Sequence, residues 1–125
     1  MIIDTTIIDM PKHRLHPLPA AAFHILMSLA DDDLHGYEIM RRVEEQTGGR
    51  TRMGPGTLYS SIQALLDAEF IAEVASRCDE GPGDARRRHY HRTAAGRKAA
   101  REEAERLADV LRLARAKRIL RGDHV

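Results

Sequence analysis

The 125-residue sequence predicts a mainly α-helical fold with a small β-hairpin. Apolar residues recur at spacings of three and four residues in three segments. Two β-type segments flank a loop that contains Gly and Pro, and a long segment rich in Ala, Leu and charged residues follows them. Apolar residues make up 42% and charged residues 31% of the chain, so it can form a core and is not a disordered polyelectrolyte. Its length suits one domain.

Two helices are expected in the first half of the chain. Pro19 suits a helix start, because the first turn of a helix leaves its N–H groups unpaired in any case, and the first helix is expected from Ala20 to Ala30. The acidic run at residues 31–33 consists of turn and cap formers that end this helix. The second helix is expected from Tyr37 to Gln46, and the glycines at 48–49 end it.

A third helix is expected after the turn formed by residues 54–57. Leu58, Ile62 and Leu65 have the i, i+4, i+7 spacing of one buried stripe. At about 100° per residue, the opposite face of this helix is small and polar, which suits a DNA groove. That face comprises Thr57, Ser60, Gln63, Ala64 and Asp67, with Tyr59 on its flank.

A β-hairpin is expected next, with strands at Phe70–Ser76 and Arg86–Thr93 joined by a loop at 77–85. The final helix is expected to run from Ala94 to about Arg121, a length of roughly 43 Å. This order of elements is that of a winged helix-turn-helix with a C-terminal extension. The chain thus divides into an N-terminal arm at 1–17, a winged helix-turn-helix domain at 18–93 and a dimerisation helix at 94–125.

The second strand and the start of the last helix are strongly basic, although the net charge of the chain is only +1. From Arg86 to Arg101 the chain carries six Arg and one Lys and no acid. A basic strand pair beside a polar helix face is typical of nucleic-acid-binding domains, because cations that dock on phosphates release counterions. The alternative is a solvated sheet edge, since charges on edge strands also discourage aggregation.

Several other functions are disfavoured by the sequence. No apolar run reaches the ~18 residues of a membrane span, and the first residues lack the basic start of a secretory signal. The single cysteine, Cys78, excludes an internal disulfide and a Cys-rich zinc site, so a cytoplasmic protein is expected. No grouping of a nucleophile with a base indicates an enzyme, and neither a cofactor nor a resident metal is expected.

Three stretches of the chain, taken in order, resemble landmark stretches of the PadR-like transcriptional regulators. They are His35–Ile39, Gly54–Tyr59, and Arg86–Tyr90 continuing through Thr93–Arg97. The resemblance runs from about Leu18 to Leu120 and implies a dimeric winged-helix DNA-binding protein, usually a repressor. The single C-terminal helix resembles the short-tailed branch of the family, in which it serves dimerisation. The family commonly has Leu where Arg92 stands, which leaves open how that strand end packs.

The resemblance and the helical pattern imply the same DNA contacts. The hydroxyls of Thr57 and Tyr59 would bond phosphates, whereas Ser60 and Gln63 would reach base edges. The other residues expected to bind DNA are Arg50, Arg52, Arg86, Arg87, Arg88 and His89. The alternative for Tyr59 is a boundary residue whose ring packs on the core, and for the loop arginines it is an exposed charge without a ligand.

The last helix carries an apolar seam. The seam comprises Ala100, Ala104, Leu107, Leu111 and Ala114, with Val110 and Leu113 beside it. A lone long helix cannot bury such a stripe on a small winged domain, so we expect it to pack against a second copy of the chain. The alternative is that the helix folds back onto the first helix of its own chain.

The leading hypothesis is a sequence-specific DNA-binding repressor that acts as a homodimer on a palindromic operator. One alternative is a winged-helix protein-interaction module that binds no DNA. The other is a metal- or redox-responsive regulator that uses Cys78, His89 and His91, although three soft ligands without a spacing signature are weak support. The sequence identifies no small-molecule effector.

Overall fold

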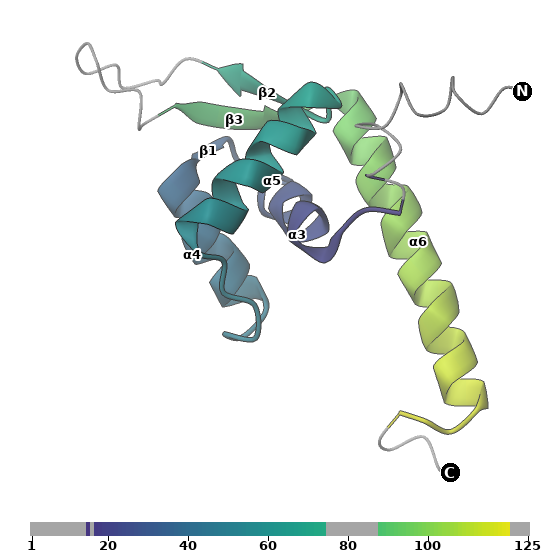
Figure 1. The fold of residues 1–125 in the computed structure, drawn as a ribbon. Coiled ribbons are helices and arrows are strands. Elements are labelled where there is room, and N and C mark those ends of the chain that lie inside the picture. The colour runs from purple at the N-terminus through teal and green to yellow at the C-terminus, as the bar shows by residue number, and fades with distance from the viewer. Residues whose placement is uncertain (1–14, 16, 75–87, 121–125) are drawn as a thin grey trace, which may run out of the picture.

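The computed structural model describes residue 15 and residues 17–74 and 88–120. Three helices form a compact body, a small sheet covers one side of it, and a long final helix extends from it (Figure 1). The elements are α3 (Ala20–Ser28), β1 (Leu34–His35), α4 (Gly36–Gln46), α5 (Pro55–Asp67), β2 (Ile71–Val74), β3 (His89–Arg92) and α6 (Ala94–Ala116). This architecture confirms the expected mainly helical fold with a winged helix-turn-helix order.

The bounds of all four described helices differ from the expectation: α4 begins at Gly36 rather than Tyr37, and α6 ends at Ala116 rather than near Arg121. Helix α5 begins at Pro55, inside the stretch expected to be a turn, with Gly54 as its N-cap. Proline is accommodated there because the first helical position needs no N–H donor. Helix α3 ends at Ser28, before the acidic run rather than at it, and the Ser28 hydroxyl donates to the Ile25 carbonyl at 2.7 Å.

The sheet contains a strand that the sequence analysis missed. Its order is β1-β3-β2 and both pairs are antiparallel, with Leu34 opposite Tyr90 and Ile71 opposite Arg92. Strand β1 has only two residues, too few to show an alternating pattern. Its pairing joins the start of α4 to the wing strand β3.

The core is formed where α3, α4 and α5 meet. Ile25, Leu26, Ile39 and Leu58 have no exposed surface, and apolar contacts of this kind supply most of the stability of a small domain. The core also includes Leu15, which is 5% exposed although it falls within the arm predicted at residues 1–17. The predicted boundary after residue 17 therefore leaves one core residue on the side of the arm.

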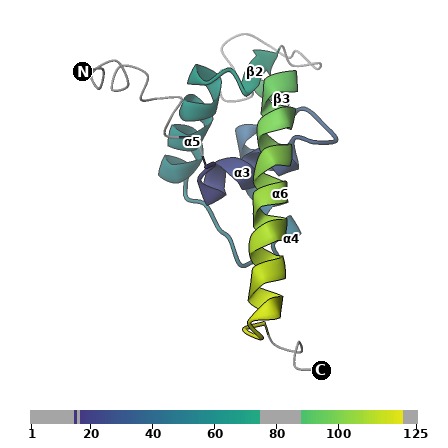
Figure 2. The same cartoon turned by 90° about the vertical axis from the view of Figure 1, so that its right-hand side faces the viewer.

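Helix α6 is attached to the body by its first half only. Figures 1 and 2 show that this half lies beside α3 and the end of β3, while the rest extends away from the body. A Cβ atom on Gly96 would lie 2.0 Å from the Phe70 carbonyl oxygen, so only glycine allows this approach. The same Cβ would lie 3.2 Å from Cγ of Arg92, so the arginine stem packs over this glycine where the resembling family commonly has Leu.

Within the described residues, every helix is too short or too polar to cross a membrane. Residues 75–87, which include Arg86, Arg87 and Cys78, lie outside the described part of the chain, as do residues 1–14, 16 and 121–125.

Candidate nucleic-acid interface

Helix α5 buries one side in the core and exposes the side expected to face DNA. Leu58, Ile62 and Leu65 are at most 2% exposed, as their spacing predicted. The exposed residues of the helix include Thr57, Tyr59, Ser60 and Gln63. Because the apolar side is fixed in the core, these side chains are held on a rigid support rather than on a loop.

Two polar side chains on this face, Ser60 and Gln63, form hydrogen bonds within their own helix. The Ser60 hydroxyl donates to the Thr57 carbonyl at 3.4 Å, and the Gln63 amide donates to Oδ1 of Asp67 at 3.0 Å. Both interactions are exposed to water, where exchanging one hydrogen-bond partner for another costs little. Gln63 can therefore leave Asp67 for a base edge.

Tyr59 combines the two alternatives considered for it. The residue is 49% exposed, and its ring leans on the start of α4, where its hydroxyl would lie 2.5 Å from a Cβ at position 36. It also lies near the wing strand β3, where it acts on Tyr90. The pKa of Tyr90 is raised first by burial, then by the Glu73 carboxylate and last by the Tyr59 phenol, whereas Arg88 lowers it. Tyr59 thus lies where α5, α4 and β3 meet.

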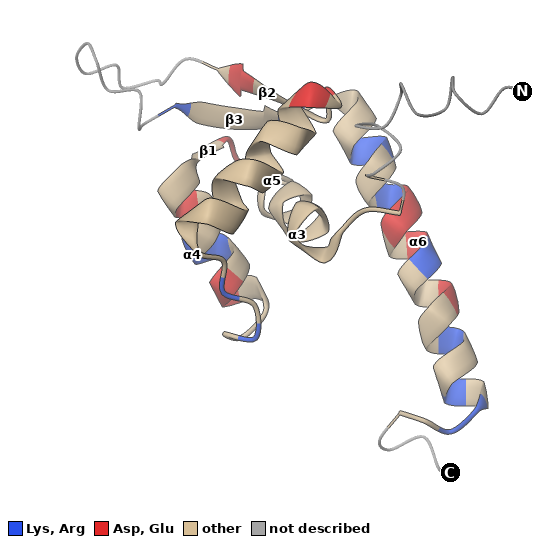
Figure 3. Ribbon diagram, in the orientation of Figure 1, with Lys and Arg blue, Asp and Glu red and all other residues tan. Residues whose placement is uncertain are grey.

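Lys and Arg residues lie on the segments beside α5, which itself contains no Lys or Arg (Figure 3). On the loop before the helix, Arg50 is exposed, and Nε of Arg52 lies 3.3 Å from Oε2 of Glu44. The Arg52 side chain is 76% exposed, and an ion pair this open to solvent is weak. Gly48 and Gly49 shape this loop with φ angles of 62° and 83°, which favour glycine.

The wing supplies the second basic group. Nη1 of Arg88 lies 3.0 Å from Oε2 of Glu73 on β2, an acid that the sequence analysis did not associate with the wing arginines. His89 is half-buried, and its ring meets the His35 ring edge-on at 5.5 Å between centroids. The structure therefore places Arg88 and His89 at the base of the wing, whereas Arg86 and Arg87 lie outside the described residues.

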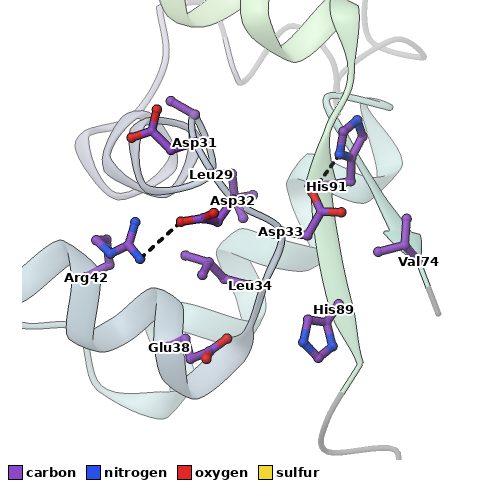
Figure 4. Close-up of a pocket in the computed structure, with 11 residues that line it drawn as sticks. Leu29, Asp31, Asp32, Asp33, Leu34, Glu38, Arg42, Val74, His89 and His91 are labelled. Atoms are coloured by element: carbon purple, nitrogen blue, oxygen red, sulfur yellow. Dashed lines mark hydrogen bonds and ion pairs between the residues drawn. The ribbon is translucent and has the colours of Figure 1, made fainter. Parts of the chain in front are cut away.

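The base of the wing is tied to the helical body through the acidic run. Nδ1 of His91 lies 2.7 Å from Oδ1 of Asp33, and Nη2 of Arg42 lies 3.6 Å from Oδ2 of Asp32. Both pairs line a cavity of about 610 Å³ between the loop after α3 and strand β3 (Figure 4). The sequence analysis explained the acidic run by a helix terminus alone, but two of its carboxylates link the loop to α4 and β3.

The start of α4 carries a further interaction that the sequence analysis missed. Nδ1 of His35 accepts from the Glu38 N–H at 3.3 Å, and Oε1 of Glu38 accepts from the His35 N–H at 3.1 Å. This is a capping box, in which two unpaired donors of the first turn are satisfied reciprocally. A histidine at the N-cap hid the signal, because Ser, Thr, Asp and Asn are the usual residues there.

The structure describes two of the three residues suggested for a metal or redox site. His89 and His91 lie on one strand, and Cys78 is outside the described residues. Among the residues that are described, no group of three or more His, Cys, Asp or Glu side chains is placed to hold a metal ion.

The seam on α6 divides between the core and the surface. Ala100 is 7% exposed and packs in the core of its own chain, so the surface left for a partner starts after it. Leu107 and Leu111 are each 40% exposed and Val110 is 51% exposed. Ala104 is exposed as well, and Ala114 is half-buried. The alternative of folding back on α3 thus describes the first half of α6 but not the second.

Comparisons with known proteins agree with this geometry. Residues 25–102 match the model of the transcriptional regulator PadR-like family. Among curated proteins, the chain is 32% identical over 84 residues to an uncharacterized 37.1 kDa protein in transposon Tn4556 of Streptomyces fradiae. That match covers 67% of this chain but 22% of the other protein, so the chain spans about a fifth of the length of this relative.

Solved structures share the fold. A transcriptional regulator from Clostridium thermocellum is 25% identical with a TM-score of 0.63, over 74% of this chain and 86% of that one. A PadR family transcription regulator from Clostridium difficile is 21% identical with a TM-score of 0.65, over 77% and 95% of the two chains. Bacillus subtilis PadR, solved in complex with operator DNA, is 23% identical with a TM-score of 0.58, over 73% and 48%.

Proposed function

Because this chain belongs to the PadR-like family of transcriptional regulators, we propose that it is a sequence-specific DNA-binding repressor that acts as a homodimer on a palindromic operator. The observation that carries the proposal is the exposed polar face of α5 around Ser60 and Gln63, which lies between two basic groups, the loop with Arg52 and the wing with Arg88. A solved family member bound to operator DNA supports it.

In this proposal, the neutral and the basic side chains perform different tasks. Ser60 and Gln63 read base edges in the major groove, and a glutamine amide suits the N6 and N7 atoms of adenine. The arginines contact phosphates, which fixes the position of α5 on the duplex without reading sequence. Arg52 and Arg88 can exchange their exposed carboxylate partners for phosphates, because exposed ion pairs contribute little.

The exposed second half of α6 supplies the reason for a dimer. Its leucines and valine form an apolar stripe that water covers in the single chain, and a second copy of the same helix would bury it. A two-fold dimer presents two copies of α5, which suits half-sites separated by one helical turn of DNA. Occupation of such an operator would block the transcription machinery from the same DNA.

Fluorescence anisotropy with the DNA upstream of the chain's own gene tests the proposal. Affinity should fall steeply between 50 and 200 mM salt, by roughly 10³-fold for about six phosphate contacts. Gln63→Ala should reduce the preference for the operator over unrelated DNA, by about 1–3 kcal/mol. Arg88→Ala should weaken binding to all sequences alike and make the salt dependence shallower.

Glu73→Gln is the matched control for the wing. It removes the carboxylate that pairs with Arg88 and leaves the arginine in place, so it should strengthen binding to any DNA where Arg88→Ala weakens it. Binding that responds neither to salt nor to sequence would reject the proposal and favour the protein-interaction module.

A further inference from the structure

The position of Tyr59 depends on the absence of a side chain at position 36. A Cβ atom built on Gly36 would lie 2.5 Å from the Tyr59 hydroxyl oxygen, 3.1 Å from Cζ and 3.2 Å from Cε1. The first of these distances is far below any ordinary contact between a carbon and an oxygen atom. The phenol of Tyr59 therefore occupies the space that any other residue at position 36 would fill.

Backbone conformation gives no reason for a glycine at position 36. The described glycines with a positive φ angle are Gly48 and Gly49, whereas Gly36 has the ordinary helical conformation of the first turn of α4. Glycine also lowers helix stability by about 1 kcal/mol relative to alanine when it stands within a helix. The close approach of Tyr59 is the interaction that a larger side chain would remove.

Tyr59 packs on the start of α4 and lies in the neighbourhood of β3. Its ring leans on the buried Gly36 at the start of α4, and its phenol is near enough to Tyr90 on β3 to influence that group. Strand β1 joins these two elements directly, because Leu34 pairs with Tyr90 and His35 pairs with His89. Gly36, on which Tyr59 packs, thus follows directly after the strand that attaches the wing to the helical body.

We propose that Gly36 is a positioning residue for DNA binding, which lets the Tyr59 phenol lie across the start of α4 and directs its hydroxyl to a DNA phosphate. The inference rests on the proposed function and assigns part of it to a residue that makes no DNA contact itself. Tyr59 is 49% exposed in this position, so part of its side chain stays open to solvent while the ring packs on Gly36.

Substitution of Gly36 by alanine separates this role from a structural one. The atoms in the way are at the far end of the tyrosine side chain, so the ring can turn aside and the fold can persist. Alanine favours the helix more than glycine does, so the melting temperature should stay the same or rise. Affinity for operator DNA should nevertheless fall by about tenfold, the value of one hydrogen bond to a charged group.

The experiment compares the wild type with Gly36→Ala, Tyr59→Phe and the double variant, by anisotropy with operator DNA and by thermal unfolding. Tyr59→Phe keeps the ring and removes the hydroxyl, so it should lose affinity as Gly36→Ala does. The double variant should lose no more than either single variant, since all three lack the same contact. The salt dependence should stay as steep as in the wild type, because a hydroxyl neutralises no phosphate charge.

Each outcome bears on a separate statement. Wild-type binding to the operator tests the proposed function, and its absence would overturn both proposals. If the wild type binds, the positioning role is overturned when Gly36→Ala binds as the wild type does, or when its loss adds in full to that of Tyr59→Phe. A lower melting temperature of Gly36→Ala that fully accounts for weaker binding would overturn it as well.

Discussion

The two halves of α6 belong to one continuous helix but have different environments. The first half, from Ala94 to Glu103, has its buried residues at Gly96, Ala100 and Glu103 and lies against the body (Figure 2). In the second half, from Ala104 to Ala116, the leucines and valine are 40–54% exposed. The helical hydrogen bonds are the same in both halves, so the difference comes from what each half packs against.

The boundary between the halves is marked by an ion pair. Glu103 is 6% exposed, and its two carboxylate oxygens lie 3.0 and 2.6 Å from Nε and Nη2 of Arg106. The hydrogen bonds that Arg106 donates to Glu103 raise the pKa of the guanidinium further above its usual range, so Arg106 stays charged. A single helix thus completes the core of one chain and then offers apolar surface beyond it.

The largest effect is expected where the first half of α6 meets the body. Gly96→Ala places a methyl group 2.0 Å from the Phe70 carbonyl oxygen, which is backbone and cannot turn aside. We expect a loss of about 3 kcal/mol in the free energy of unfolding, as for an overpacked core. Urea unfolding monitored by circular dichroism measures it.

Gly56→Ala is the matched control, because a Cβ at that position on α5 meets no atom within 4 Å. It should leave stability unchanged or slightly higher, since alanine favours a helix. If Gly96→Ala and Gly56→Ala lowered the free energy of unfolding equally, the close contact of α6 with Phe70 would not be what holds the first half of α6 in place.

The second-largest effect is expected in the second half and concerns association. Leu107→Asp together with Leu111→Asp should weaken a dimer by about 2 kcal/mol. The two leucines would no longer bury apolar surface in the interface, and two carboxylates would have to be buried there instead. The unfolding of the single chain should hardly change, since both side chains are already exposed in it. Sedimentation equilibrium measures the association.

The control for the dimer is Arg112→Gln, which changes the net charge by the same sign on another side of the helix. Arg112 lies roughly 140° round the helix from Leu107, and its partner Asp109 is exposed as well. A wild-type chain that is monomeric at micromolar concentration would contradict the expected interface, whatever the variants do.

How much of this molecule could be predicted from its sequence depends on the range of the interaction. The spacing of Leu58, Ile62 and Leu65 alone placed the buried side of α5, because a helix repeats its faces every 3.6 residues. Strand β1 was missed, since two residues show no period and their strand character comes from pairing with β3. The fold class was therefore predictable, whereas the link between α4 and the wing was not.

The candidate site shows the same division. The exposure of Ser60 and Gln63 followed from the helical pattern. The contact between Gly36 and Tyr59 joins residues 23 positions apart, and the pair of Arg88 with Glu73 joins two strands. No local pattern contains such pairs, so the partners of these functional residues required the three-dimensional structure.

A smaller effect is expected from two residues with a left-handed backbone conformation, one before β2 and one after α6. Glu69 at the turn before β2 has a φ angle of 66°, and Arg118 after α6 has a φ angle of 57°. A residue with a side chain pays about 1 kcal/mol for this left-handed conformation, so Glu69→Gly should raise the free energy of unfolding by about that amount. The Glu69 carbonyl, which accepts from the Thr93 hydroxyl at 2.8 Å, remains in place.

Arg118→Gly should change global stability much less, although it relieves the same conformation. The side chains at the end of α6 are largely exposed among the described residues, so its last turn can open without unfolding the body. Chemical denaturation of both variants measures the difference. Equal gains from the two substitutions would mean that the exposed half of α6 folds together with the core even in the single chain.

The smallest effect is expected from the pH dependence of the packed region. Tyr90 on β3 is 6% exposed, and burial, followed by the Glu73 carboxylate, raises its pKa above the usual value. The folded state therefore favours the neutral phenol. Below pH 10 both states are protonated and stability is unaffected, but as pH rises further the unfolded chain ionises first and stability falls. Tyr90→Phe should make this alkaline loss shallower in urea unfolding curves recorded between pH 9 and 11, whereas Tyr37→Phe, which alters a residue that is 59% exposed, should leave it unchanged. If Tyr90→Phe left the pH dependence of the free energy of unfolding unaltered, the Tyr90 phenol would not contribute to the loss of stability at alkaline pH. Its burial would then be too shallow to favour the neutral form.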